Sequence, residues 1–74
     1  MNRWLLYDRY SAEPQAFSTT MDDPTDEEFM QAMRSQNIIM RGKMVLIAPV
    51  DDFYVVSEID SGEELYTIES DEEY

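Results

Sequence analysis

The side chains of this sequence that could do chemistry are mainly carboxylates, and they gather toward one end of the chain. No positive residue follows Lys43, whereas residues 44–74 hold ten acidic side chains: Asp51, Asp52, Glu58, Asp60, Glu63, Glu64, Glu69, Asp71, Glu72 and Glu73. The whole chain has a formal net charge of −12, so this segment supplies most of the excess negative charge. A charge distribution of one sign produces a strong field over a protein surface. The pattern therefore indicates a basic partner.

Carboxylates can also bind metal ions or perform acid–base catalysis, and the sequence argues against both roles. Calcium and magnesium need several converging oxygen ligands, but neither Asp51-Asp52 nor residues 60–64 match the spacing of a calcium-binding loop. The chain has no cysteine and no histidine, which excludes thiolate nucleophiles and zinc–thiolate sites. Catalysis by paired carboxylates needs a substrate cleft, for which 74 residues leave little room. We therefore expect a non-enzyme without metal or cofactor.

The density of these carboxylates is of the same order as that of nucleic acid. Duplex DNA carries one negative charge per about 1.7 Å of axis, so ten charges span about 17 Å, and a strand of five or six residues is about 17–20 Å long. We expect the carboxylates to stand in for phosphates, with Tyr54 as an exposed aromatic anchor because it alternates with a core-facing Phe53. The predicted partner-binding residues are Asp51, Asp52, Tyr54, Glu58, Asp60, Glu63, Glu64 and Glu69.

A second acidic cluster marks the start of a helix. It comprises Asp22, Asp23, Asp26, Glu27 and Glu28. Asp23 is expected to be the N-cap, with Pro24 at the first helical position, and the helix dipole favours acidic side chains in the first turn. Apolar residues between positions 29 and 33 follow helical spacing, which predicts a helix over residues 24–36. Capping alone accounts for this cluster, which extends the acidic surface only if it lies beside the other carboxylates.

The remaining segments have the patterns of strands and turns. Strands are expected at residues 3–10, 16–21, 44–48, 53–59 and 64–68, with turns at 49–52 and 60–63. Residues 38–40 are expected to lead into a further turn at 41–42. Gly62 can take a positive φ in the last turn, and pairing across it should bring Glu58 near Glu64 or Leu65. Residues 70–74 are expected to fray. The elements together predict a single α+β domain over residues 1–74, with one helix packed on an antiparallel meander of three to five strands.

Composition narrows the classes of protein further. A content of 43% hydrophobic residues predicts a folded core, but a domain this small without disulfide or metal is marginally stable, which keeps a homodimer as an open alternative. Five basic residues cannot offset seventeen acidic ones, so direct nucleic-acid binding is not expected. The apolar runs are too short for a signal peptide or a membrane span, and an acidic surface is not attracted to anionic lipids. We expect a soluble cytoplasmic protein.

These observations favour a non-enzymatic inhibitor that occupies the basic DNA- or RNA-binding groove of a host protein. Restriction, CRISPR and repair enzymes and transcription factors are the expected targets. In composition the chain resembles phage-encoded inhibitors that imitate DNA; this resemblance implies a phage or mobile-element origin and a bacterial host cell. Three alternatives stay open: an adaptor subunit that docks through a sheet edge or a helix face, an antitoxin that masks a basic toxin, and an acidic surface that serves only solubility.

Overall fold

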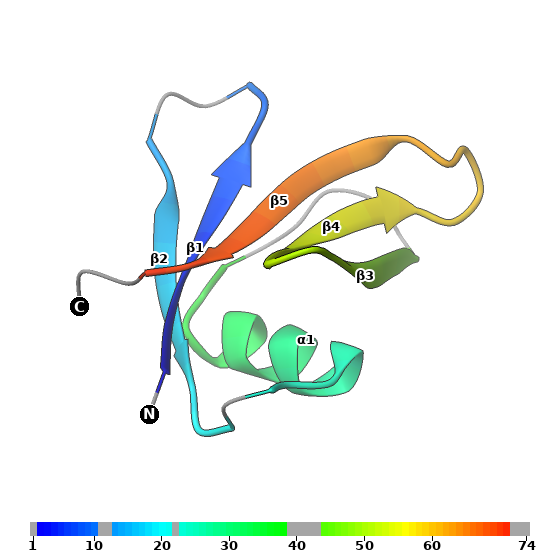
Figure 1. Cartoon of the computed structure of the whole chain (residues 1–74). Coiled ribbons are helices and arrows are strands. Elements are labelled where there is room, and N and C mark those ends of the chain that lie inside the picture. Colours follow the sequence, from blue (N-terminus) through cyan, green and yellow to red (C-terminus); the bar gives the residue numbers. More distant parts are fainter. Residues whose placement is uncertain (1, 11–12, 22, 39–43, 72–74) are drawn as a thin grey trace.

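Five strands form one antiparallel sheet, and a single helix packs on one of its faces (Figure 1). The computed structural model describes residues 2–10, 13–21, 23–38 and 44–71. The elements are β1 (Asn2–Asp8), β2 (Gln15–Thr19), α1 (Asp26–Ser35), β3 (Val45–Val50), β4 (Phe53–Glu58) and β5 (Glu64–Ser70). The strand order is β2-β1-β5-β4-β3, so the last strand of the chain lies at the centre. The predicted two-layer α+β fold is confirmed.

The helix is shorter than predicted and begins later. Thr25, not Asp23, is the N-cap: its side chain accepts a hydrogen bond from the Glu28 N–H at 3.3 Å. Threonine followed three residues later by glutamate is the pattern of a capping box, which explains the choice. At the other end Asn37 has φ 64°, and the Ile38 N–H donates to the Met33 carbonyl at 2.8 Å. This geometry is a Schellman motif, with Asn in the position that glycine most often fills.

The hairpin between β3 and β4 turns more tightly than predicted. β3 continues through Pro49 to Val50, so the turn consists only of Asp51 and Asp52 instead of residues 49–52. Pro49 is tolerated inside this strand because β3 lies at the edge of the sheet. Asp51 takes φ 54°, a conformation that aspartate adopts more readily than most residues. The predicted turn at 41–42, and most of the segment at 38–40 that leads into it, fall on residues 39–43, which lie outside the described residues.

A β-bulge changes the pairing across the last hairpin. The register shifts between Val56 and Ser57, so Ser57 faces Glu64 and Leu65 is the extra residue. Glu58 consequently does not face Glu64 across the ladder; its backbone N–H donates to the Glu63 carbonyl at 2.9 Å. Gly62 has φ 72°, which confirms the positive φ predicted for this turn.

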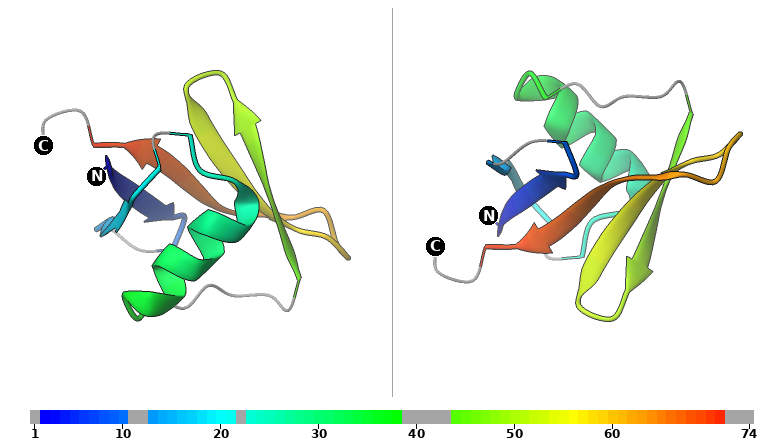
Figure 2. Two further views of the ribbon diagram at one scale, coloured as in Figure 1. Left: turned by 90° about the horizontal axis from the view of Figure 1, so that it is seen from below. Right: turned by 90° about the horizontal axis from the view of Figure 1, so that it is seen from above.

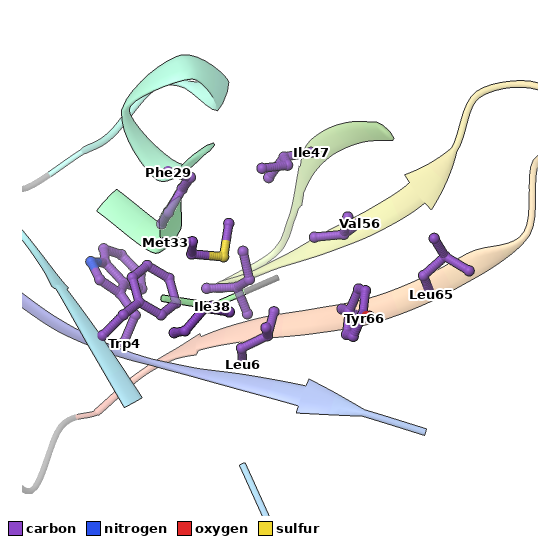
Figure 3. Close-up of a cluster of buried hydrophobic side chains, with 11 residues drawn as sticks. Trp4, Leu6, Phe29, Met33, Ile38, Ile47, Val56, Leu65 and Tyr66 are labelled. Atoms are coloured by element: carbon purple, nitrogen blue, oxygen red, sulfur yellow. The ribbon is translucent and has the colours of Figure 1, made fainter. Parts of the chain in front are cut away.

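The core fills the space between α1 and the sheet, where side chains from the helix and all five strands meet (Figure 3). Phe29 and Met33 of the helix are fully buried. The Trp4 ring packs edge-on against Phe29 and Tyr54, with ring centroids 5.2 Å and 5.8 Å apart. Edge-to-face pairs of this kind add about 0.5–1.5 kcal/mol each beyond their buried area. Views from below and from above show the helix on one side of the sheet only (Figure 2).

β5 extends further than predicted. It continues from residue 68 to Ser70, and the Asp71 N–H donates to the Arg3 carbonyl at 3.0 Å. The fraying expected for residues 70–74 stays a prediction, and residues 72–74 lie outside the described part of the chain.

Candidate acidic interface

One part of the predicted surface lies at the end of the sheet where β3 turns into β4. Asp51 and Asp52 form the turn itself, and Glu69 lies directly opposite Phe53 on the neighbouring strand β5. All three acidic side chains are exposed. We call Asp51, Asp52 and Glu69 the β3–β4 acidic group. No ion pair to a described residue neutralises any of the three.

The other part lies at the opposite end of β4. Glu58, Asp60, Glu63 and Glu64 surround the turn between β4 and β5, and we call them the β4–β5 acidic group. The turn is held by Ser61, whose hydroxyl donates to a Glu58 carboxylate oxygen at 2.9 Å and accepts the Glu63 N–H at 3.2 Å. Arg9 approaches Glu63 at 3.8 Å, with both side chains about half exposed.

The two groups do not form one patch. Phe53 and Glu58 are five residues apart along β4, which places the two ends of the strand about 17 Å from each other. Figure 1 shows the β4–β5 turn at the far tip of the hairpin, away from the β3–β4 turn. The predicted partner-binding carboxylates are therefore brought together as two groups that flank the sheet.

The acidic cluster at the start of α1 has local structural roles. Asp22 lies outside the described residues. Asp26, Glu27 and Glu28 occupy the first turn, where the helix dipole favours them. A carboxylate oxygen of Asp23 accepts the Tyr54 hydroxyl at 3.1 Å. Burial raises the pKa of Tyr54 above its usual value near 10, and the hydrogen bond to Asp23 and the negative charge of Asp23 raise it further.

The aromatic anchor predicted from the sequence faces the wrong way. Tyr54 lies on the helix-covered side of β4, where its ring packs 4.8 Å from that of Phe29, and Phe53 points to the opposite side. The prediction that Phe53 faces the core and Tyr54 is exposed is therefore wrong. Tyr7 is the residue that sequence reasoning missed: it is 38% exposed on the side opposite Trp4 and Leu6. Strand alternation in residues 4–7 was the signal that could have found it.

A hollow of about 530 Å³ lies next to Tyr7. Leu5, Tyr7 and Phe53 supply its apolar and aromatic walls, and Asp52, Glu69 and Asp71 supply carboxylates. Asp71 forms an ion pair with Arg3 at 3.2 Å. An aromatic wall beside carboxylates suits a positively charged group, because the ring face and the anions both attract it.

Other surfaces considered for docking are already used within the fold. The apolar stripe of α1 is turned toward the core. At the β2 edge, the Gln36 side-chain amide accepts the Ser18 N–H at 3.0 Å and donates to the Ser18 carbonyl at 2.8 Å. Gln36 thus takes the place that a pairing strand would occupy at this edge. An adaptor subunit could still dock by pairing a partner strand with β3, which forms the other edge of the described sheet. Pro49 weakens this mode because proline lacks the backbone N–H that would donate to the partner strand.

The described residues contain neither a metal-binding group nor a membrane-spanning helix, and no related protein was found. Among the described residues, no group of three or more Asp, Glu, His or Cys side chains is arranged to hold a metal ion. Within the same part of the chain, no helix has the length and apolar character that crossing a bilayer requires. No family model, curated protein or solved structure matches the sequence or the fold.

Proposed function

We propose that the protein is a non-enzymatic inhibitor that binds a basic, nucleic-acid-binding protein and competes with its DNA or RNA. The observation that carries the proposal is the pair of acidic groups at the two ends of β4. Asp51, Asp52 and Glu69 at one end, like Asp60 and Glu64 at the other, are exposed and make no ion pair to a described residue. Exposed carboxylates that no described residue neutralises attract a basic groove and speed association with it.

The spacing of the groups is compatible with a nucleic-acid groove. About 17 Å of duplex carries about ten phosphate charges, and the same length of β4 separates the two groups. A basic groove that normally follows such a backbone presents cations over this length, so both groups can be engaged together. A bacterial restriction, CRISPR or repair enzyme or a transcription factor in the cytoplasm is the proposed target, and a phage or mobile element is the proposed origin.

The first experiment is a pull-down with the tagged protein from a bacterial lysate, washed at about 0.05 M and then about 0.5 M salt. A stoichiometric nucleic-acid-binding protein that is released by salt or by added duplex DNA is the expected result. A partner that resists both treatments overturns the mimicry proposal in favour of apolar docking. Retention of many basic proteins in small amounts contradicts it in favour of a surface that serves solubility.

Three matched double variants then test which carboxylates act. Each exchanges one Asp for Asn and one Glu for Gln: Asp52→Asn with Glu69→Gln, Asp60→Asn with Glu64→Gln, and, as control, Asp26→Asn with Glu27→Gln on the helix. Exposed ion pairs are worth about 0.2–1 kcal/mol each, so we expect each of the first two variants to weaken binding of the captured partner by about 2- to 30-fold. The helix control should bind nearly as well as the unaltered protein. Equal effects in all three would mean that only total charge matters.

A further inference from the structure

The sheet face opposite the helix carries many apolar side chains. Pairing aligns Tyr7, Thr67, Val55 and Ala48 in a row that crosses β1, β5, β4 and β3 on this side. A neighbouring row contains Leu5, Glu69, Phe53 and Val50. We call this side of the sheet the open face, since no described segment covers it (Figure 2). The solvent-facing side of an antiparallel sheet is ordinarily polar at such positions.

The exposure of these residues is highest around the exposed tyrosine and along the edge strand. Tyr7 is 38%, Leu46 51% and Val50 40% exposed. Tyr7 lines the 530 Å³ hollow and also a second hollow of about 210 Å³, to which Arg9 and Glu64 contribute. Two depressions that share Tyr7 can receive side chains from a partner.

A second copy of this chain is poorly suited to cover the open face. Five strands about 4.8 Å apart and about 17 Å long give a face of about 400 Å². A symmetric dimer through this face alone would bury about 800 Å² in total, which is below the size of a stable interface, whereas a partner that also contacts the two acidic groups buries a larger area. It would also bring two chains of net charge −12 together, with Glu69 of each copy in the contact.

The negative charge beside the open face favours binding of a basic partner instead. Asp52, Glu69 and Asp71 line the larger hollow, and Arg3 offsets one of these charges through its ion pair with Asp71. Two negative charges therefore remain beside the aromatic walls. A guanidinium can stack on Tyr7 or Phe53 while it donates hydrogen bonds to carboxylates. The same acidic rim disfavours an anionic membrane surface.

We propose that the open face docks a basic amphipathic segment of the partner protein, with apolar side chains on Val55 and its neighbours and an arginine in the hollow beside Tyr7. The proposal rests on the proposed function for the basic character of the partner. The two acidic groups attract that partner at long range, and the open face makes the short-range contact. The length of the face along its strands, about 17 Å, matches about 12 residues of a helix, which rise about 18 Å.

The test uses the full chain and two synthetic peptides. The first is a blocked helical peptide of about 12 residues with leucine along one side and arginine on both flanks; the second keeps the arginines and replaces every leucine by glutamine. Backbone amide chemical shifts of the ¹⁵N-labelled protein locate each peptide and give its dissociation constant. We expect the leucine peptide to shift the amides of Leu5, Tyr7, Val55 and Thr67, and the glutamine peptide to bind more weakly and to shift chiefly the two acidic groups.

Two pairs of variants make the result specific. Tyr7→Ala should weaken the leucine peptide by about 5- to 30-fold, whereas Tyr10→Ala, which alters another exposed tyrosine beyond the end of β1, should change it less than twofold. Thr67→Arg places a cation at the centre of the open face and should abolish binding. Gln31→Arg makes the same charge change on the exposed side of α1 and should have little effect. Amide spectra of all four variants verify that they fold.

Each other outcome overturns the inference in a distinguishable way. Shifts confined to the two acidic groups, with no effect of Tyr7→Ala, would reject the open face but leave the proposed function intact. Open-face shifts that change with protein concentration before any peptide is added would assign the face to a second copy. Absence of binding by either peptide would also reject the docking site, while the proposed function would still be judged by the DNA-released partner from the lysate.

Discussion

Replacing Thr19 by valine removes a hydroxyl on which the indole of Trp4 depends. Trp4 Nε1 donates to Thr19 Oγ1 at 2.9 Å, and Thr19 Oγ1 donates in turn to the Met21 carbonyl at 3.0 Å. Trp4 is 6% and Thr19 4% exposed, so water is poorly placed to replace the lost acceptor. Valine has a similar shape and a high strand propensity. The substitution therefore isolates the hydrogen bonds of the hydroxyl from packing and backbone effects.

The expected loss is large for a domain of this size. A buried donor left without a partner costs about 1–3 kcal/mol, whereas a domain of 74 residues has a free energy of unfolding of about 4–11 kcal/mol. We expect Thr19→Val to lower the free energy of unfolding by about 1–3 kcal/mol and the Tm by about 4–20 °C. The assay is urea unfolding followed by far-UV circular dichroism. Fluorescence is unsuitable because Trp4 is the only tryptophan and its emission depends on the altered contact.

Two controls separate the hydrogen bond from the position. Thr19→Ser keeps the hydroxyl and should lose less stability than Thr19→Val. Thr20→Val makes the same chemical change at an exposed neighbour and should stay within about 0.5 kcal/mol of the unaltered protein. A Thr19→Val protein as stable as the unaltered one would refute the assignment of this hydroxyl as the partner of the indole.

Three further predictions concern the backbone, pH and salt. Asn37→Gly and Asp51→Gly should each raise the free energy of unfolding by about 0.5–1 kcal/mol, because these residues have positive φ angles of 64° and 54°, which glycine adopts without strain. Gly62→Ala should lower the free energy of unfolding, because Gly62 has φ 72°. Thermal unfolding that ranks the three variants otherwise would contradict the argument from backbone strain. Burial, and to a smaller extent the hydrogen bond and charge of Asp23, raise the folded-state pKa of Tyr54, so the contribution of Tyr54 to stability is fully present below about pH 10 and is lost as pH rises through the folded pKa. Urea unfolding from pH 8 to 11 should show a steeper loss than in Tyr54→Phe, and equal slopes would reject the raised pKa. Because the net charge of −12 is self-repulsive, the Tm should rise between about 0.02 M and about 0.5 M sodium chloride, and a fall would show that repulsion is unimportant.

Local signals predicted the elements, and competing local signals explain the errors at their ends. The helical spacing of Phe29 and Met33 identified α1, and both residues are buried in it. Its start was misplaced because Asp23 followed by proline and Thr25 followed by Glu28 both match N-terminal patterns, and only the second has the reciprocal spacing of a capping box. The turn at Gly62 was found because positive φ depends on the residue itself.

Pairing between strands that are distant in sequence determines which side chains face the core, and this could not be predicted from the sequence. Phe53 and Tyr54 are adjacent aromatic residues, so alternation alone does not tell which one faces the core. Tyr54 faces inward because it pairs with Ile68, a fully buried residue of the central strand β5. The central position of β5 depends on its pairing with β1, far away in sequence. The bulge beside Ser57 likewise arises from the fit of two strands, and it changed which carboxylates lie near one another.

The positions of the acidic residues follow from the apolar side chains that β4 places on both faces of the sheet. A continuous row of phosphate-like charges along β4 would require carboxylates at alternate positions on the open face, but Phe53 and Val55 lie there. The acidic residues of β4, β5 and the two turns beside β4 are therefore confined to the turns themselves and to strand ends, at Glu58, Glu64 and Glu69. Any resemblance to nucleic acid consequently resides in the separation of two charged ends, and a partner that bridges both ends along the open face also contacts the apolar residues between them. Charge and apolar contact are thus coupled by the geometry of one strand, so removing either acidic group should weaken the contribution of the open face as well.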